Sequence, residues 1–327
     1  RRRPPAPSAS SAAGAGAAGE AGPPRPPGAE AGAGAGAMRL DLDVAVDPVL
    51  APPERVQPRV VRGAEPGAVL KHVQKWLDAL RLQGVQRVMA FGTDMDGRSR
   101  LICRFVRPQC PPGHIDPADS FAIEAAAKYV SMIPFLTDRD MFPALNDLWC
   151  TDQEFLNIQC GDWEEHAILL CNFFNYIDGY RREHVEMYSG TCIHSYCVLC
   201  DTLPDGEMWM VLRCDLNSGH CELWQAVSSD CYFVPRREPP KWRCCPSRRR
   251  DSSDKEAPLQ ATPMIPVQRV YLAFNSDNVW ANLQYLGLQG AARPGLLRLG
   301  LDLRDARRWR PLFAKGREDL ERLSGGG

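Results

Sequence analysis

The residues around 161–174 have the spacing of a helix that begins beside a catalytic nucleophile. Asp162 is a favourable N-cap, and Glu164 and Glu165 fall in the first turn, where their charges complement the positive end of the helix dipole. A thiol hydrolase places its cysteine at such a helix start, because the dipole lowers the pKa of the thiol. Here the position carries Trp163, whose indole offers no nucleophile. The segment therefore predicts a fold that has kept the helix and lost the chemistry.

Two cysteines and one histidine near this helix could supply displaced chemistry. Cys160 precedes the helix start, and Cys171 lies two turns into the helix on its apolar face, where a thiol usually behaves as a small buried hydrophobe. His166 lies on the same helix but has no thiol at the right place to activate. An active thiol hydrolase that uses Cys160 or Cys171 is therefore the alternative to a non-catalytic domain.

A second set of side chains offers ligands that suit zinc. The candidate ligands are Cys192, His194, Cys197, Cys200, His220 and Cys221. Residues three apart in a strand point to opposite faces, so a strand through Cys197 and Cys200 would prevent these two from sharing one ion. We therefore expect no metal and no cofactor, and a zinc-stabilised binding module is a further alternative.

Composition narrows the class of protein. The chain has 327 residues, of which 44% are hydrophobic, so it can bury a core. Its net charge of −1 gives no electrostatic case for nucleic acid as a partner. It has no apolar run of about 18 residues that would predict a transmembrane segment. The 13 cysteines are expected to be reduced thiols, and a start at Arg1 rather than methionine predicts a fragment or a processed chain.

The first 135 residues divide into two parts. Residues 1–67 are predicted to be disordered, since 28 of the first 37 are glycine, alanine or proline. Residues 68–135 are predicted to form a helix over 68–84, a hairpin with strands over 87–91 and 100–106, and a second helix over 121–132. Asp94 and Asp96 resemble the opening of a calcium loop, but the missing distal glutamate favours a plain turn.

The remaining residues predict an α+β domain over 136–315, followed by a tail over 316–327. The helix from residue 162 to about 177 precedes strands over 196–199, 207–214, 221–224 and 267–274, and Val279 begins an amphipathic segment. Trp309, Leu312 and Phe313 are expected to pack the end of the domain. A Pro-rich insertion over 235–266 holds eight Lys or Arg against four Asp or Glu and is expected to be an exposed loop.

Several motifs occur in the order found in one known family. They include 101–108, 127–136, 147–149, 161–174, 203–206, 210–212, 223–224, 278–284 and 309–313. Over residues 68–315 the chain resembles the C-terminal region of the coiled-coil and C2 domain-containing protein 2A family, which comprises scaffold proteins of the ciliary transition zone. The resemblance implies a degenerate transglutaminase-like (papain-like) pseudo-peptidase domain. The family's coiled-coil and C2 modules are not visible in this sequence.

The resemblance also implies positions for a lost catalytic triad. Active members of the fold use a cysteine at the helix start, a histidine that opens a later strand and an aspartate at the end of the next strand. In this sequence these positions fall on Trp163, on Met208 or Trp209, and on Gln225. None of these residues can perform the required role, so we expect no enzymatic activity.

The implied function is a protein-interaction scaffold, because a cleft without its triad can still bind an extended peptide. The predicted cleft is lined by Trp163, Glu164, His166, Met208, Trp209, Trp224 and Gln225. The resemblance implies other ciliary transition-zone proteins as partners and a location in the cytoplasm and cytoskeleton, at the basal body and transition zone. It is also compatible with peripheral association near the ciliary membrane.

Overall fold

The structure is a computed structural model, and it describes six ranges of the chain. They are 65–85, 87–142, 147–202, 206–234, 267–285 and 300–325, all within one unit, Arg59–Gly327. Residues 1–64 and the basic insertion 235–266 lie outside the described residues, and so do the predictions made for them. None of the helices in the described ranges is long and apolar enough to cross a membrane.

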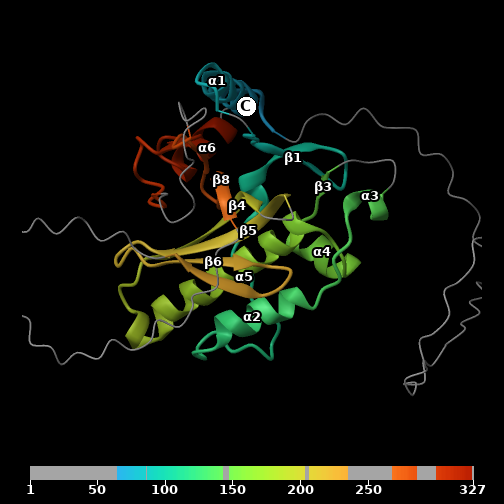
Figure 1. The fold of residues 1–327 in the computed structure, drawn as a ribbon, viewed down its shortest axis with the longest axis vertical. Helices are drawn as coiled ribbons and strands as arrows, with labels where there is room; N and C mark the ends of the chain where they lie inside the picture. Colours follow the sequence, from blue (N-terminus) through green and yellow to red (C-terminus); the bar gives the residue numbers. More distant parts are fainter. Residues whose placement is uncertain are drawn as a thin grey trace, which may run out of the picture. The chain divides into compact units, whose positions relative to one another are not determined.

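A seven-stranded antiparallel sheet organises the domain, with strand order β10-β9-β8-β4-β5-β6-β7 (Figure 1). Its strands are β4 (Ile193–Thr202), β5 (Gly206–Asp215), β6 (Cys221–Gln225), β7 (Asp230–Val234), β8 (Val267–Phe274), β9 (Val279–Asn282) and β10 (Trp309–Pro311). A smaller sheet contains β1 (Phe91–Asp94), β2 (Ser99–Leu101) and β3 (Leu148–Trp149). In it β1 pairs antiparallel with β2 and parallel with β3.

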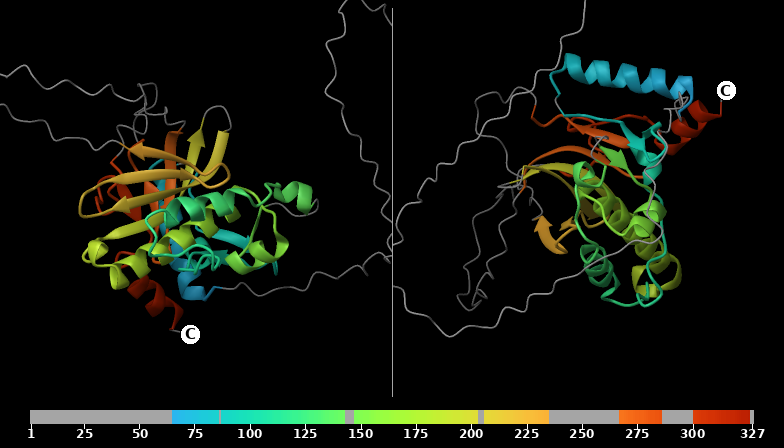
Figure 2. Two further views of the ribbon diagram at one scale, coloured as in Figure 1. Left: turned by 90° about the horizontal axis from the view of Figure 1, so that it is seen from below. Right: turned by 90° about the vertical axis from the view of Figure 1, so that its right-hand side faces the viewer.

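The helices of the described ranges pack around these sheets. They are α1 (Gly67–Leu82), α2 (Ala122–Ser131), α3 (Asp138–Met141), α4 (Asp152–Ile158), α5 (Trp163–His184) and α6 (Arg317–Ser324). The long helix α5 lies along β4 and β5, and α2 packs against α5. Figure 2 shows α1 beside α6, so the two ends of the described chain meet. The ring of His72 on α1 stacks on Phe313 at 5.4 Å between centroids.

The two faces of the large sheet bury separate hydrophobic cores. Cys197, Trp209 and Val211 contribute to the core that contains α5, whereas Cys200 and Met208 contribute to the core on the other face. This separation follows from the alternation of side chains along a strand. The expectation that Cys197 and Cys200 point to opposite faces is confirmed.

Most predicted elements are present, and the α+β fold class is confirmed. The helices over 68–84 and 121–132 correspond to α1 and α2, and the strand over 267–274 is β8. Asp94 Oδ1 accepts hydrogen bonds from the backbone N–H groups of Asp96 and Arg98 at 3.1 and 2.8 Å, which is the predicted turn. The transglutaminase-like fold itself stays a prediction.

Other elements differ from the prediction. The second hairpin strand ends at Leu101, and a short 3₁₀ helix, Ile102–Phe105, follows it. The tail forms α6, and the segment that begins at Val279 is strand β9, because it pairs with β8 on one side and β10 on the other. Strand β7 was not predicted.

The helix that starts at residue 162 also continues beyond its predicted end near 177. Two charged residues in the extension, Asp178 and Arg181, are buried because each has a partner outside the helix. Asp178 pairs with Arg213 of β5 at 2.7 Å, and Arg181 donates to the backbone carbonyls of Pro117 and Asp119. These contacts stabilise the last turns of α5, which the apolar periodicity of the sequence alone does not predict.

Candidate functional site

The start of α5 is held by a capping box. Asp162 Oδ1 accepts a hydrogen bond from Glu164 N at 3.2 Å, and Glu165 Oε2 accepts one from Asp162 N at 3.1 Å. The other oxygen of Glu165 accepts from Cys150 N at 3.1 Å, which ties the helix to the segment after β3. The predicted N-cap is therefore confirmed, and both oxygens of Glu165 accept from backbone N–H groups.

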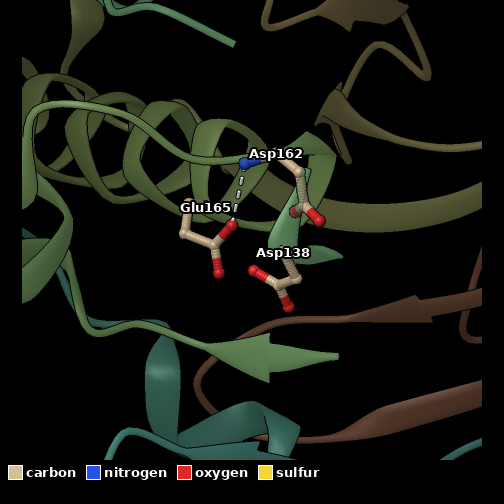
Figure 3. Close-up of side chains that lie close together, drawn as sticks. All are labelled: Asp138, Asp162 and Glu165. Atoms are coloured by element: carbon tan, nitrogen blue, oxygen red, sulfur yellow. Dashed lines mark hydrogen bonds between the residues drawn. The ribbon is translucent and has the colours of Figure 1, made fainter. Parts of the chain in front are cut away.

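Three of the carboxylates at this position form a cluster, drawn in Figure 3. Oxygens of Asp138, Asp162 and Glu165 all lie within 4.8 Å of one another, which is a spacing that a cation could use. Asp138 accepts from Leu148 N, and the other two complete the capping box, so each carboxylate already has a backbone donor. The positive end of α5 also opposes a cation there. These contacts account for the cluster, and we assign no metal to it.

Burial and mutual repulsion shift the titration of the cluster. The pKa of Asp138 is raised to about 6, chiefly by burial; the Leu148 hydrogen bond lowers it, and the charges of Asp162 and Asp147 add smaller increases. Burial is also the largest cause that raises the pKa of Glu164 and of Glu165, followed in both by contacts with Asp162. Such a group of carboxylates can share protons, and its negative charge would oppose a thiolate at the same helix start.

Aromatic rings pack against Trp163 and His166. The ring of Trp163 lies 4.8 Å from that of Phe135, measured between centroids, and the His166 ring lies 4.9 Å from Phe155. His166 is fully buried, with Nδ1 2.6 Å from the backbone oxygen of Asp162 and Nε2 3.0 Å from that of Ile133. Both ring nitrogens are thus occupied by the backbone, and the imidazole is not placed to act as a general base on a bound substrate.

The strand register shows which core each of these predicted residues belongs to. Met208 belongs to the core on the far face of the sheet, whereas Trp209 belongs to the core that contains α5. In β6, Leu223 lies in the far core and Trp224 in the near core, so alternation places Gln225 on the far side as well. Partly buried Trp163 packs against both cores, and Met208 and Trp209 cannot both hold the base position because they lie on opposite faces of β5.

The residues predicted to line a cleft do not all come together. The buried indole of Trp209 packs edge-on against Trp149 at 5.5 Å, and buried Trp224 packs against Phe174 at 5.4 Å. Phe174 follows Trp163 by 11 residues, which is about 16 Å along a helix axis. With His166 also buried, Trp163 and Glu164 are the two predicted cleft residues that remain partly exposed at the helix start. The structure therefore separates Trp224 from the start of α5, and the cleft itself stays a prediction.

The cysteines proposed as displaced nucleophiles lie in packed surroundings. Cys171 is fully buried next to Cys197, and burial followed by the contact with Cys171 raises the pKa of Cys197 far above the ordinary value. Cys160 is half-buried, with Sγ 3.5 Å from Met141 Sδ. Burial and then Glu165 raise the pKa of Cys150. These surroundings disfavour a reactive thiolate at the start of α5.

A cavity of about 550 Å³, which was not predicted, lies on the face of the sheet that carries α5. It is found where α2 and the C-terminal half of α5 meet β5, β6 and β7, and its walls include the predicted cleft residue Trp224 and the candidate zinc ligand His220. Arg213, another lining residue, forms an ion pair with Asp178, 35 positions away in the sequence. No local pattern could have indicated this contact, because it depends on the tertiary packing of α5 on β5.

Comparison with known proteins places this arrangement of helix and sheet in a family. Residues 147–312 match the family described as the CEP76 peptidase-like domain. Since these 166 residues are just over half of the 327-residue chain, the chain belongs to that family. The matched range contains α5 and the whole of the seven-stranded sheet.

A human protein is also similar in sequence to this chain. Protein CC2D2B of Homo sapiens is 24% identical to this chain over 205 residues. The match covers 61% of this chain and 11% of the human protein, so the chain spans about a ninth of its relative's length. Together the two matches confirm the resemblance to the C-terminal region of the coiled-coil and C2 domain-containing protein 2 family.

Proposed function

We propose that this domain is a non-catalytic protein-interaction scaffold. The observation that carries the proposal is the start of α5, where a thiol enzyme would hold its nucleophile and this chain holds Trp163, packed on Phe135. The neighbouring carboxylates cap the helix, and Trp209 of β5 is buried in the core that contains α5. These packing and capping side chains at the place of a nucleophile support the proposal.

The ciliary part of the proposal rests on the family. The resemblance to transition-zone scaffold proteins and the similarity to human protein CC2D2B both support a role at the cilium. We propose that the domain contributes to assembly and gating of the cilium at the basal body and transition zone. Its partners would be other transition-zone proteins, and its association with the nearby membrane would be peripheral.

Thiol labelling tests the loss of catalysis. The chain is treated with iodoacetamide at pH 7.5, natively and in guanidinium chloride, and labelling is followed residue by residue by mass spectrometry. We expect Cys171 and Cys197 to react only after unfolding, because both are fully buried. Cys160 should react no faster than the exposed Cys110, which serves as the control. Labelling of Cys160 or Cys171 about 100-fold faster than that of Cys110 would favour the thiol hydrolase.

A rescue experiment in ciliated cells tests both parts of the proposal separately. Cells that lack the protein are given either the wild-type protein or the variant with Cys160→Ala and Cys171→Ala, each with a fluorescent tag. We expect both proteins to locate to the base of the cilium and to restore equal numbers of cilia. Failure of the stable double variant alone would contradict the non-catalytic role, and absence of the wild-type protein from the cilium base would contradict the ciliary role.

A further inference from the structure

The cavity beside α5 has the chemistry of a cation-binding site. Its walls come from α2, α5, the 3₁₀ helix Glu186–Tyr188 and strands β4 to β7. Aromatic rings line one part of it, and carboxylates line another. The lining includes Glu124, Tyr188, His220, Glu222, Trp224 and Phe233.

The arginines at the cavity already use their donors within the protein. Arg213 donates through Nε and Nη2 to Asp178 at 2.8 and 2.7 Å, and through Nη1 to Glu222 Oε2 at 3.0 Å. Arg181 donates to two backbone carbonyls, and its guanidinium lies 5.0 Å from the centre of the Tyr188 ring. The trio of Arg213, Asp178 and Glu222 therefore carries a net charge of −1, and its cation is not free to bind an anion.

The carboxylates of Glu124 and Glu222, in contrast, can accept further hydrogen bonds from a group in the cavity. Glu222 Oε2 accepts from Arg213 and from the indole of Trp224 at 3.2 Å, while Oε1 lies 4.0 Å from Nδ1 of the exposed His220. Glu124 is an exposed residue of α2 on the opposite wall. Both carboxylates thus line the same cavity, one from α2 and one from β6. Glu222 is shared with Arg213, whereas Glu124 forms no ion pair with another described residue.

The aromatic residues complete the site. Phe233 of β7 is about half exposed and lies 5.7 Å from the ring of His220, and the indole of Trp224 forms part of the wall. A guanidinium group can stack on such rings while its edge donates two parallel hydrogen bonds to carboxylates. A neutral apolar side chain would instead cover the Glu124 carboxylate without giving it a partner, and the net negative charge of the Arg213, Asp178 and Glu222 trio disfavours an anion.

We propose that this cavity binds an arginine side chain of a partner protein, with the guanidinium between Glu124 and Glu222 and its stem against Trp224 and Phe233. Arginine fits better than lysine because its planar fork can reach two carboxylates at once. The site lies at the other end of α5 from Trp163. The inference therefore depends neither on the ciliary role nor on the absence of catalysis.

Fluorescence anisotropy tests the proposal on the purified chain. The probe is a fluorescein-labelled pentapeptide with a central arginine between threonine and valine residues, and its control carries citrulline, the neutral isostere of arginine. We expect saturable binding of the arginine peptide below about 1 mM and at least about tenfold weaker binding of the citrulline peptide, since hydrogen bonds to charged groups are the stronger ones. Equal binding of the two peptides, or no binding of the arginine peptide at 1 mM, would overturn the proposal.

Substitutions then locate the peptide. Glu222→Gln and Glu124→Gln each remove one charge while keeping the shape, and each is expected to weaken the arginine peptide about tenfold. Glu318→Gln on α6 removes an exposed charge elsewhere and should change nothing. Because Glu222 also holds Arg213, the urea unfolding curve of each variant is measured, and Glu124→Gln provides the test that leaves the ion pair intact. Unchanged affinity in Glu124→Gln and in a folded Glu222→Gln would refute the site.

Discussion

The carboxylate cluster at the start of α5 makes the stability of the domain depend on pH in an unusual direction. Asp138 is buried, and its oxygens lie within 4.8 Å of those of Asp162 and Glu165. Burial raises the pKa of Asp138 from 3.8 to about 6, so the folded protein holds this proton more tightly than the unfolded chain does. The resulting stability is present in full below about pH 4 and is lost as the pH rises through about 6. Asp138→Asn keeps the shape and the acceptor for Leu148 N but never ionises.

The expected size follows from the geometry. A shift of about two pKa units at about 1.4 kcal/mol per unit corresponds to about 3 kcal/mol of destabilisation by the ionised form. Coulomb's law gives a similar scale, because two like charges 4.8 Å apart repel by about 3.5 kcal/mol at an effective dielectric constant of 20. Local rearrangement and water would reduce both figures. We therefore expect Asp138→Asn to raise the free energy of unfolding by about 1–3 kcal/mol above pH 7.

Urea denaturation between pH 4.5 and 8 measures this difference directly. The gain of Asp138→Asn over wild type should be small at pH 4.5, grow through pH 5–6 and level off above pH 7. Asp140→Asn is the matched control, since Asp140 lies on the same short helix but is exposed, and it should show no comparable gain. A gain that does not change with pH, or a loss of stability at pH 7.5, would refute the raised pKa of Asp138 in the folded protein.

Three substitutions test other contacts by urea denaturation at neutral pH. Gly92→Ala would bring Cβ within 2.6 Å of the indole of Trp149, so we expect a loss of about 1–3 kcal/mol, and an unchanged stability would show that the ring can move. Arg213→Leu leaves the buried carboxylate of Asp178 without its bidentate partner and should cost about 3–5 kcal/mol; a loss below about 1 kcal/mol would mean that solvent reaches this carboxylate. Asp162→Ala removes the N-cap of α5 and should cost about 1–2 kcal/mol, unless Glu165 alone suffices to hold the helix start.

The elements that the sequence predicted are those with a strong local signal. The apolar repeat and the N-cap at Asp162 gave the start of α5, and the run of residues 267–274 gave β8. Strand β9 was not predicted because four residues are too few to distinguish a strand from one turn of helix by sequence pattern. Only its pairing with β8 and β10 shows that it is a strand. The extension of α5 to His184 depends on partners that are far away in the sequence.

The same limit applies to the site. The sequence by itself determined that the start of α5 carries Trp163 and a capping box in place of a nucleophile, because capping and helix periodicity are local properties of the chain. It could not decide which face of β5 each residue occupies, so the base position was left between Met208 and Trp209, which lie on opposite faces of the sheet. Only the tertiary structure decided this register. It also places His166 in the interior against two backbone carbonyls, and it creates the cavity beside Arg213. The physical reason is that burial and charge pairing arise between segments far apart in the chain, where no local spacing specifies them.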